Sequence, residues 1–262
     1  MELLDLIDPI RFRTFMLVLA RVSVFLFLFP IFSSSAFPNQ LKIGLALVLA
    51  LLFYTVVPVD PARFPRDIPT FGLMLGAEIL VGFTLGLCLR IFFAGVQMAG
   101  ELIGFQVGFS MINVMDPQSG ENVSIMDQIG YWVCLIIFLV LNGHHIIIMS
   151  MIDSFELVPV GGFVMHAAIP PRVMDVAAGL FVDAVKISAP VIAVLTFVNT
   201  GFGLVAKFSP QTNVMMVAFP VKIVVGLIFF AMTLPIIAIV SRDYIEPCRK
   251  LFLALLFYMG GG

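Results

Sequence analysis

Six long apolar stretches constrain this chain more than any other feature. A helix needs about 20 predominantly apolar residues to cross the hydrocarbon core of a bilayer, because its backbone polar groups must be bonded within the helix. The stretches that meet or approach this length are residues 14–32, 43–59, 71–89, 129–152, 187–206 and 221–240. Together they predict an all-α, polytopic, membrane-associated helical protein.

The composition supports the same class. Of the 262 residues, 61% are hydrophobic and only 11% are charged. Soluble domains carry about 45–50% apolar and about 25% charged residues, so this chain has too few charges to cover a water-facing surface. The composition therefore argues against a soluble enzyme. The net charge of −2 gives no basic surface for nucleic acid, and no nucleic-acid partner is expected.

Motifs of known catalytic or metal-binding chemistry are missing from the sequence. It contains no H-E-x-x-H zinc helix, no G-x-S-x-G turn and no P-loop, and its three cysteines lack the spacing of a zinc site. His144 and His145 are adjacent, so on a helix they would diverge by about 100° instead of sharing a face. This polar pair predicts a helix break or an interfacial turn. We expect no enzymatic activity, no metal and no cofactor.

Small residues recur every four positions in the region 71–108. Gly82 and Gly86 form one such pair, and Gly100 and Gly104 form another. This spacing puts small side chains on one helical face, where a neighbouring backbone can approach closely. The sequence leaves open whether that neighbour lies in this chain or in another subunit.

Outside the long stretches, we expect a short interfacial helix around residues 173–185 and a tail, residues 251–259, that is too short to span.

Several ionisable residues lie within or beside the apolar stretches. Each costs about 2.5–3.5 kcal/mol at the centre of a membrane helix unless it is paired or faces a cavity. The candidates for buried ion pairs or subunit contacts are Arg21, Glu78, Arg90, Glu101 and Lys222. Glu78 and Arg90 would be about 18 Å apart along one helix, so they cannot neutralise each other there. Their partners must come from other segments or chains, with a proton or ion relay as the less favoured alternative.

Residues 104–120 differ from every other segment. Large flexible apolar groups, among them Phe109, Met111 and Met115, alternate with glycines and polar residues before the turn at Asp116-Pro117. Methionine is unbranched and adaptable, so such a segment can close an irregular space and reopen. The alternative is a surface loop that simply connects two helices.

The chain resembles the FliR family of flagellar type III export proteins. The resemblance lies in four regions, residues 21–49, 78–120, 142–159 and 188–226. The first region includes Arg-Val-Ser-Val-Phe, which begins at Arg21, and the Phe-Pro pairs at 29–30 and 37–38. The third includes Asn-Gly-His-His, which begins at Asn142. The fourth includes Ser-Pro-Gln-Thr-Asn-Val at 209–214 and Phe-Pro-Val-Lys at 219–222. The order and spacing of these elements make the resemblance specific.

The resemblance implies an architecture and a set of partners. It implies tilted helical hairpins that assemble with FliP, FliQ and FlhB into a superhelical export gate for unfolded flagellar proteins. That gate would lie among lipid in the bacterial inner membrane, at the flagellar basal body. Residues 1–185 would be a FliP-like segment and residues 186–262 a FliQ-like hairpin and tail.

The resemblance also implies a pore plug within residues 106–122. Its expected residues are Gly108, Phe109, Ser110, Met111, Ile112, Asn113, Val114, Met115, Asp116 and Pro117. Two alternatives remain open at this point. One is the homologous gate subunit of a virulence injectisome, and the other is a stand-alone secondary transporter.

Overall fold

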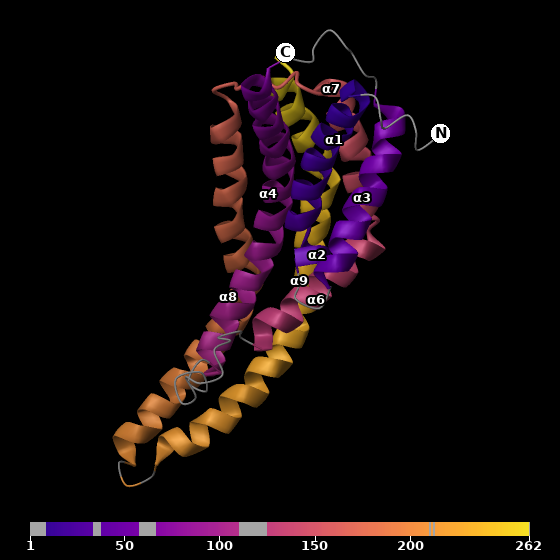
Figure 1. Ribbon diagram of the computed structural model, residues 1–262. Coiled ribbons are helices and arrows are strands. Elements are labelled where there is room, and N and C mark those ends of the chain that lie inside the picture. The colour runs from indigo at the N-terminus through magenta and orange to yellow at the C-terminus, as the bar shows by residue number, and fades with distance from the viewer. Residues whose placement is uncertain are drawn as a thin grey trace. The chain divides into compact units, whose positions relative to one another are not determined.

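The computed structural model describes residues 9–33, 38–57, 67–109, 125–209, 211 and 213–261. All regular secondary structure in these residues is helical, as Figure 1 shows, which confirms the predicted fold class. The helices are α1 (Pro9–Leu28), α2 (Pro30–Ser33), α3 (Asn39–Val56), α4 (Ile68–Val107), α6 (Ile125–Val140), α7 (Gly143–Leu157), α8 (Ile169–Phe208) and α9 (Val214–Met259).

Three of the described helices, α4, α8 and α9, are long and apolar enough to cross a membrane. The bent pair α6 and α7 would make a fourth crossing if it counts as one broken span. Two of the six expected stretches do not qualify by the same measure. Helix α1 carries Arg11, Arg13 and Arg21, which is too many charges for one span, and α3, with 18 residues, is at the short end of the length that a span needs. By length and composition, the described helices therefore offer three crossings, or four with the bent pair, against six apolar stretches.

Two segments that were expected to be separate lie within the long helices α8 and α9. Residues 173–185 continue within α8, so the expectation of a separate short helix there is wrong. Residues 251–259 form the end of α9 and are not a separate tail, and their place at the interface or on a partner stays a prediction. Apolar residues of each segment extend the adjoining helix without a break. At 1.5 Å per residue, the 40 residues of α8 reach about 60 Å and the 46 of α9 about 69 Å. Both lengths are roughly twice the ~30 Å hydrocarbon thickness.

The predicted break near His144 is confirmed. Helix α6 ends at Val140 and α7 begins at Gly143, so the helical backbone is interrupted between these residues. Asn142 lies between them in the left-handed region, with φ of 57°. Asparagine tolerates that conformation better than most residues, because its short polar side chain can bond locally.

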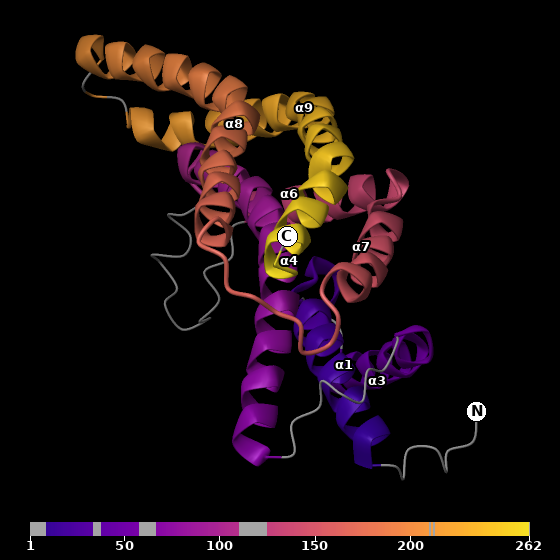
Figure 2. The same ribbon diagram turned by 90° about the horizontal axis from the view of Figure 1, so that it is seen from above.

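The chain divides into two compact units. Unit 1 comprises Met1–Ile91, Asn142–Ala177 and Ile245–Gly262, and unit 2 comprises Phe92–Leu141 and Ala178–Tyr244. Helices α4, α8 and α9 contribute residues to both. In unit 1, α1 packs against α3, and Figure 2 shows the two helices crossing. In unit 2, α8 and α9 form an antiparallel hairpin. These units are not the two segments predicted from the sequence, residues 1–185 and 186–262. That division rests on the likeness of each segment to another gate subunit, and it stays a prediction.

Candidate functional site

A buried ion pair lies at the centre of unit 1. The Nε atom of Arg21 in α1 is 2.5 Å from the Oε2 atom of Glu78 in α4, and both side chains are completely buried. The two residues are 57 positions apart in the sequence. The pair therefore connects two helices through charged groups that would be costly if either were left alone in an apolar interior.

The remaining guanidinium donors of Arg21 cap the end of α7. Its Nη1 donates to the carbonyl oxygen of Ser154 at 2.7 Å, and its Nη2 donates to that of Val158 at 3.0 Å. The carbonyl of Ser154 also accepts the N–H of Val158 at 3.1 Å, so Arg21 is its second donor. A cation at the C-terminal end of a helix also interacts favourably with the helix dipole. The guanidinium carbon lies 4.3 Å from the ring centroid of Phe155. Arg21 thus joins α1 to the C-terminal turn of α7.

The second oxygen of Glu78 binds the turn that follows α7. Its Oε1 accepts the backbone N–H of Gly161 at 2.9 Å, where Gly161 has φ of +74°. Glycine adopts this conformation without a steric penalty. We call Arg21, Glu78, Ser154, Phe155, Val158 and Gly161 the Arg21 cluster. Because both carboxylate oxygens and three guanidinium nitrogens have partners, the cluster fixes one register among α1, α4 and the end of α7.

Glycines in the first half of α4 allow the approach of α1. A Cβ atom on Gly82 would collide with the carbonyl oxygen of Arg21, and one on Gly86 would lie 2.7 Å from the Cβ of Leu28. By contrast, Gly72 and Gly76 face open space. Within this unit, Gly82 and Gly86 therefore serve packing of the chain on itself.

In unit 2, α4 ends in a Schellman motif. The N–H of Phe109 donates to the carbonyl of Gly104 at 3.0 Å, and that of Gly108 donates to Phe105 at 3.2 Å. Gly108 has φ of +102°, which the motif requires at this position. Two turns earlier, a Cβ on Gly100 would lie 2.5 Å from the Cα of Asp127, so α6 crosses α4 there.

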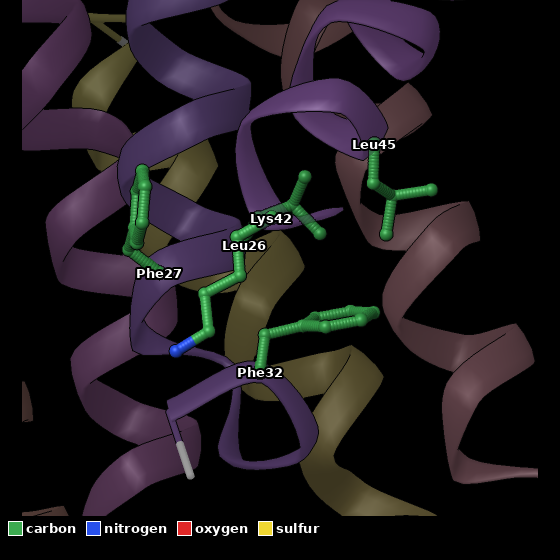
Figure 3. Close-up of a pocket in the computed structure, with 5 residues that line it drawn as sticks. All are labelled: Leu26, Phe27, Phe32, Lys42 and Leu45. Carbon is green, nitrogen blue, oxygen red and sulfur yellow. The ribbon is translucent and has the colours of Figure 1, made fainter. Parts of the chain in front are cut away.

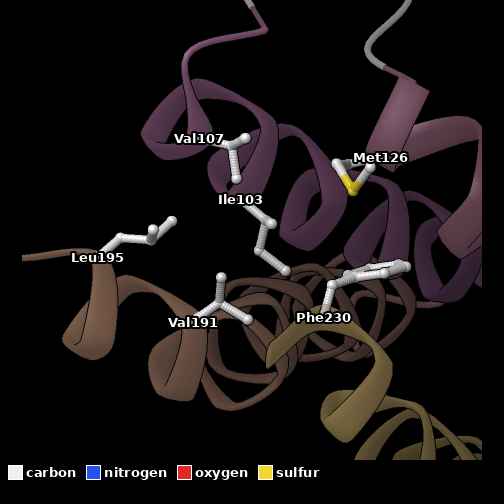
Figure 4. Packing of buried hydrophobic residues seen from close by; sticks show 6 residues of the cluster. All are labelled: Ile103, Val107, Met126, Val191, Leu195 and Phe230. Atoms are coloured by element: carbon white, nitrogen blue, oxygen red, sulfur yellow. The ribbon is translucent and has the colours of Figure 1, made fainter. Parts of the chain in front are cut away.

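An apolar cluster surrounds this helix end. As Figure 4 shows, side chains from α4, α6, α8 and α9 meet there, and we call them the apolar cluster: Ile103, Val107, Met126, Val191, Leu195 and Phe230. Phe109 packs against it and is partly buried. The first two residues of the expected plug therefore have a fixed base in unit 2. The others, Ser110, Met111, Ile112, Asn113, Val114, Met115, Asp116 and Pro117, lie outside the described residues.

The other expected charged residues do not join the Arg21 cluster. Arg90 and Glu101 occupy exposed positions, and Lys222 is partly buried in α9. Sequence reasoning missed the roles of Ser154, Val158 and Gly161. These residues act through backbone atoms or a hydroxyl, at 83 or more positions from the charges they meet, and no local pattern marks them.

One pocket and the metal-binding potential of the described residues bear on small-molecule chemistry. A pocket in unit 1 is lined by Leu26, Phe27, Phe32, Lys42 and Leu45, as Figure 3 shows. Its lining is apolar apart from the lysine, so it lacks an acid–base pair. Among the residues that the structure describes, no group of three or more His, Cys, Asp or Glu side chains is placed to hold a metal ion.

These features define a polytopic α-helical membrane protein with long apolar helices, one broken helix pair and a buried ion pair. Residues 12–247 match the model of the family described as bacterial export proteins, family 1. The chain belongs to the FliR family of flagellar biosynthetic proteins. The family description names bacterial export, and the names of its members place them in flagellar biosynthesis.

Several curated relatives carry the name flagellar biosynthetic protein FliR. The protein from Bacillus subtilis strain 168 is 34% identical over 92% of this chain and 95% of its own length. The protein from Escherichia coli strain K12 is 30% identical over 84% of each chain. The protein from Aquifex aeolicus strain VF5 is 30% identical over 91% of this chain and 92% of its own length. The similarity thus extends over nearly the whole chain.

Proposed function

We propose that this chain is a noncatalytic subunit of the flagellar type III export gate. It forms with FliP and FliQ, and with FlhB, the gated conduit through which unfolded flagellar proteins pass at the inner membrane, in the basal body. The observation that carries this proposal is the likeness to flagellar biosynthetic relatives over almost the entire chain, within a family of bacterial export proteins.

The apolar surface of the hairpin supports assembly with other subunits. Phe197 and Phe208 in α8 are 78% and 82% exposed, and Met216 in α9 is 73% exposed. Helices of about 60 and 69 Å exceed a hydrocarbon core of roughly 30 Å, so lipid cannot cover their whole length. Contiguous exposed apolar surface outside lipid is typical of a protein–protein interface. In this proposal, Arg90, Glu101 and Lys222 contact neighbouring subunits.

The segment from Gly108 to Pro117 is the proposed plug. Gly108 ends α4, and Phe109 is held on the apolar cluster, so the segment starts from a fixed base. The flexible side chains of Met111, Ile112 and Met115 suit a seal that must close around an irregular opening and release again. The glycines at 82, 86, 100 and 104 are proposed to preserve the helix packing that holds this base.

Replacement of residues 109–115 by a glycine–serine segment of equal length tests the plug. We expect FliP and FliQ to copurify with the variant while the membrane becomes permeable to small solutes. The matched control is Phe105→Ser, which alters an exposed apolar residue one turn earlier and leaves the plug intact. An intact permeability barrier in the loop variant would contradict the plug, and failure of the native chain to copurify with FliP and FliQ would contradict the subunit assignment.

Complementation separates the alternatives. The relatives described above carry a flagellar name, which favours the flagellar gate over its injectisome homologue. We expect the chain to restore motility to a strain that lacks its own FliR. Restoration of injectisome secretion without motility would favour the homologue, and transport of a small solute by the purified chain alone would favour a secondary transporter.

The same proposal includes a FliP-like segment, residues 1–185, and a FliQ-like segment, residues 186–262.

A further inference from the structure

The connection between α7 and α8 is held in unit 1 from two sides. We call residues 158–168 the strap. It follows Leu157, the last residue of α7, and leads directly into Ile169, the first residue of α8. Val158 and Gly161, at the start of the strap, belong to the Arg21 cluster, and Val164 and His166, further along it, contact the C-terminal end of α9. The two attachments differ in strength.

The attachment to the Arg21 cluster is strong. The carbonyl of Val158 accepts a hydrogen bond from Arg21, and the N–H of Gly161 donates one to Glu78, both within a buried ion pair. Hydrogen bonds to charged groups are about twice as strong as neutral ones, and their loss here would leave a buried charge without a partner. The N-terminal end of the strap is therefore firmly anchored.

The attachment to α9 is the weaker one and is exposed on the strap side, while Met259 in α9 is buried. A single backbone hydrogen bond of 2.8 Å joins the N–H of Val164 to the carbonyl of Met259. The rings of His166 and Tyr258 stack with centroids 5.2 Å apart. Val164 and Met165 are 48% and 68% exposed, so little apolar surface holds this end in place. Segments with few buried contacts open locally at low free-energy cost.

A pivot lies between the two attachments. Gly161 has φ of +74°, and the N–H of Gly162 donates to the carbonyl of Pro159 at 2.7 Å in a tight turn. Hinges are short segments whose backbone angles absorb a movement while their flanks stay rigid. Residues 163–168 can therefore swing about this turn while Val158 and Gly161 keep their bonds to the Arg21 cluster.

We propose that the strap is a releasable latch between the two ends of the α8–α9 pair. The Val164–Met259 bond ties the residues just before α8 to the last residue of α9, so movement of one end away from the other must break it. The latch is closed in the resting subunit, and its release is a required step when the gate opens for an exported protein. This inference rests on the proposed function in the export gate.

An engineered disulfide can lock the latch. A Cβ built on Gly261 would lie 3.9 Å from the Cβ of Val164, which is within the range that disulfides require. The variant Val164→Cys/Gly261→Cys is tested in the assembled complex in cells, oxidised with diamide and then reduced with dithiothreitol. The native cysteines at 88, 134 and 248 are buried and do not compete. The matched control, Val164→Ser/Gly261→Ser, carries the same strain at Gly261, whose φ is +83°.

Export by the oxidised variant should fall at least about tenfold relative to its reduced form and to the serine control, because the tie can no longer open. FliP and FliQ should copurify equally in every state, and reduction should restore export. Undiminished export by the fully cross-linked variant would overturn the latch. If deletion of the whole chain leaves export intact, the proposed function fails instead, and that outcome is distinct.

Hydrogen exchange on the unmodified full chain tests the latch without any substitution. The N–H of Val164 should exchange at least about tenfold faster than that of Gly161, because only the former lies on the releasable side. Equal protection of both amides would contradict a latch with one fixed and one releasable attachment, even if the cysteine variant failed to accumulate.

Discussion

The Arg21 cluster in unit 1 and the apolar cluster in unit 2 hold helices together by different physics. The first uses directional hydrogen bonds between buried charges and backbone groups, and the second uses contact between aliphatic and aromatic side chains. Hydrogen bonds to a buried charge fail abruptly when one partner is removed, whereas an apolar core loses stability in proportion to the volume that is deleted. The two units should therefore respond differently to substitution.

The largest effect is expected for Arg21→Met. The substitution leaves the Glu78 carboxylate buried without its cation, which should lower the free energy of unfolding by about 3–5 kcal/mol. Thermal unfolding of the purified protein in detergent measures the loss. The double variant Arg21→Met/Glu78→Gln removes the stranded charge and should recover some of the stability. Equal loss in the single and double variants would show that the ion pair is not the source of the effect.

The apolar cluster should show a graded response. Ile103→Ala deletes buried volume and should cost about 2–5 kcal/mol, whereas Ile103→Val should cost only about 0.5–1.5 kcal/mol. The same unfolding measurement compares them, with the exposed residue Phe105, changed to alanine, as a control that leaves the cluster filled. If Ile103→Val lowered the free energy of unfolding as much as Ile103→Ala does, the apolar cluster would not show the graded response that distinguishes it from the Arg21 cluster.

Two glycines in α4 separate a packing role from an intrinsic helix effect. Gly82→Ala places a methyl group against the backbone of Arg21 and should cost about 1–3 kcal/mol, since neither helix can yield without moving the Arg21 cluster. Gly76→Ala meets open space and should stabilise the helix by about 0.5–1 kcal/mol. The difference in unfolding temperature between these variants is the measurement. If both variants unfold alike, the close approach at Gly82 has no energetic consequence.

The smallest effect is expected at the exposed start of α4. The carboxylate of Asp67 accepts hydrogen bonds from the Thr70 hydroxyl and from the Thr70 N–H at 3.2 Å. The hydroxyl hydrogen bond is the main cause that lowers the pKa of Asp67 below its ordinary value of 3.8. The cap therefore stabilises the helix fully above that value and is lost as the pH falls through the lower pKa of the folded state.

Hydrogen exchange at Thr70 measures this cap. Protection of its N–H, corrected for the intrinsic pH dependence of exchange, should decrease as the medium is acidified past the pKa of Asp67. Asp67→Asn keeps a capping side chain but removes the titration, so its protection should not change with pH. An identical pH response in both proteins would assign the effect to another group.

The sequence predicted some features of the site and could not predict others. The glycine spacing identified Gly82, Gly86 and Gly100, because small residues on one helical face are visible in the sequence itself. The cost of an intramembrane charge drew attention to Arg21 and Glu78. Nothing in the sequence indicated that Val158 and Gly161 would meet these charges, because they contribute only backbone atoms and every residue has those.

By itself, the sequence determined the helical class, the membrane environment and the family, because apolar run length, charge content and ordered motifs are properties of the chain. Tertiary structure alone decided that α4, α8 and α9 each continue through both units, that Arg21 pairs with Glu78, and that the end of α9 binds the strap. These outcomes depend on contacts between residues far apart in the chain. Their free energies arise only when packing brings such residues together and excludes both water and lipid from between them.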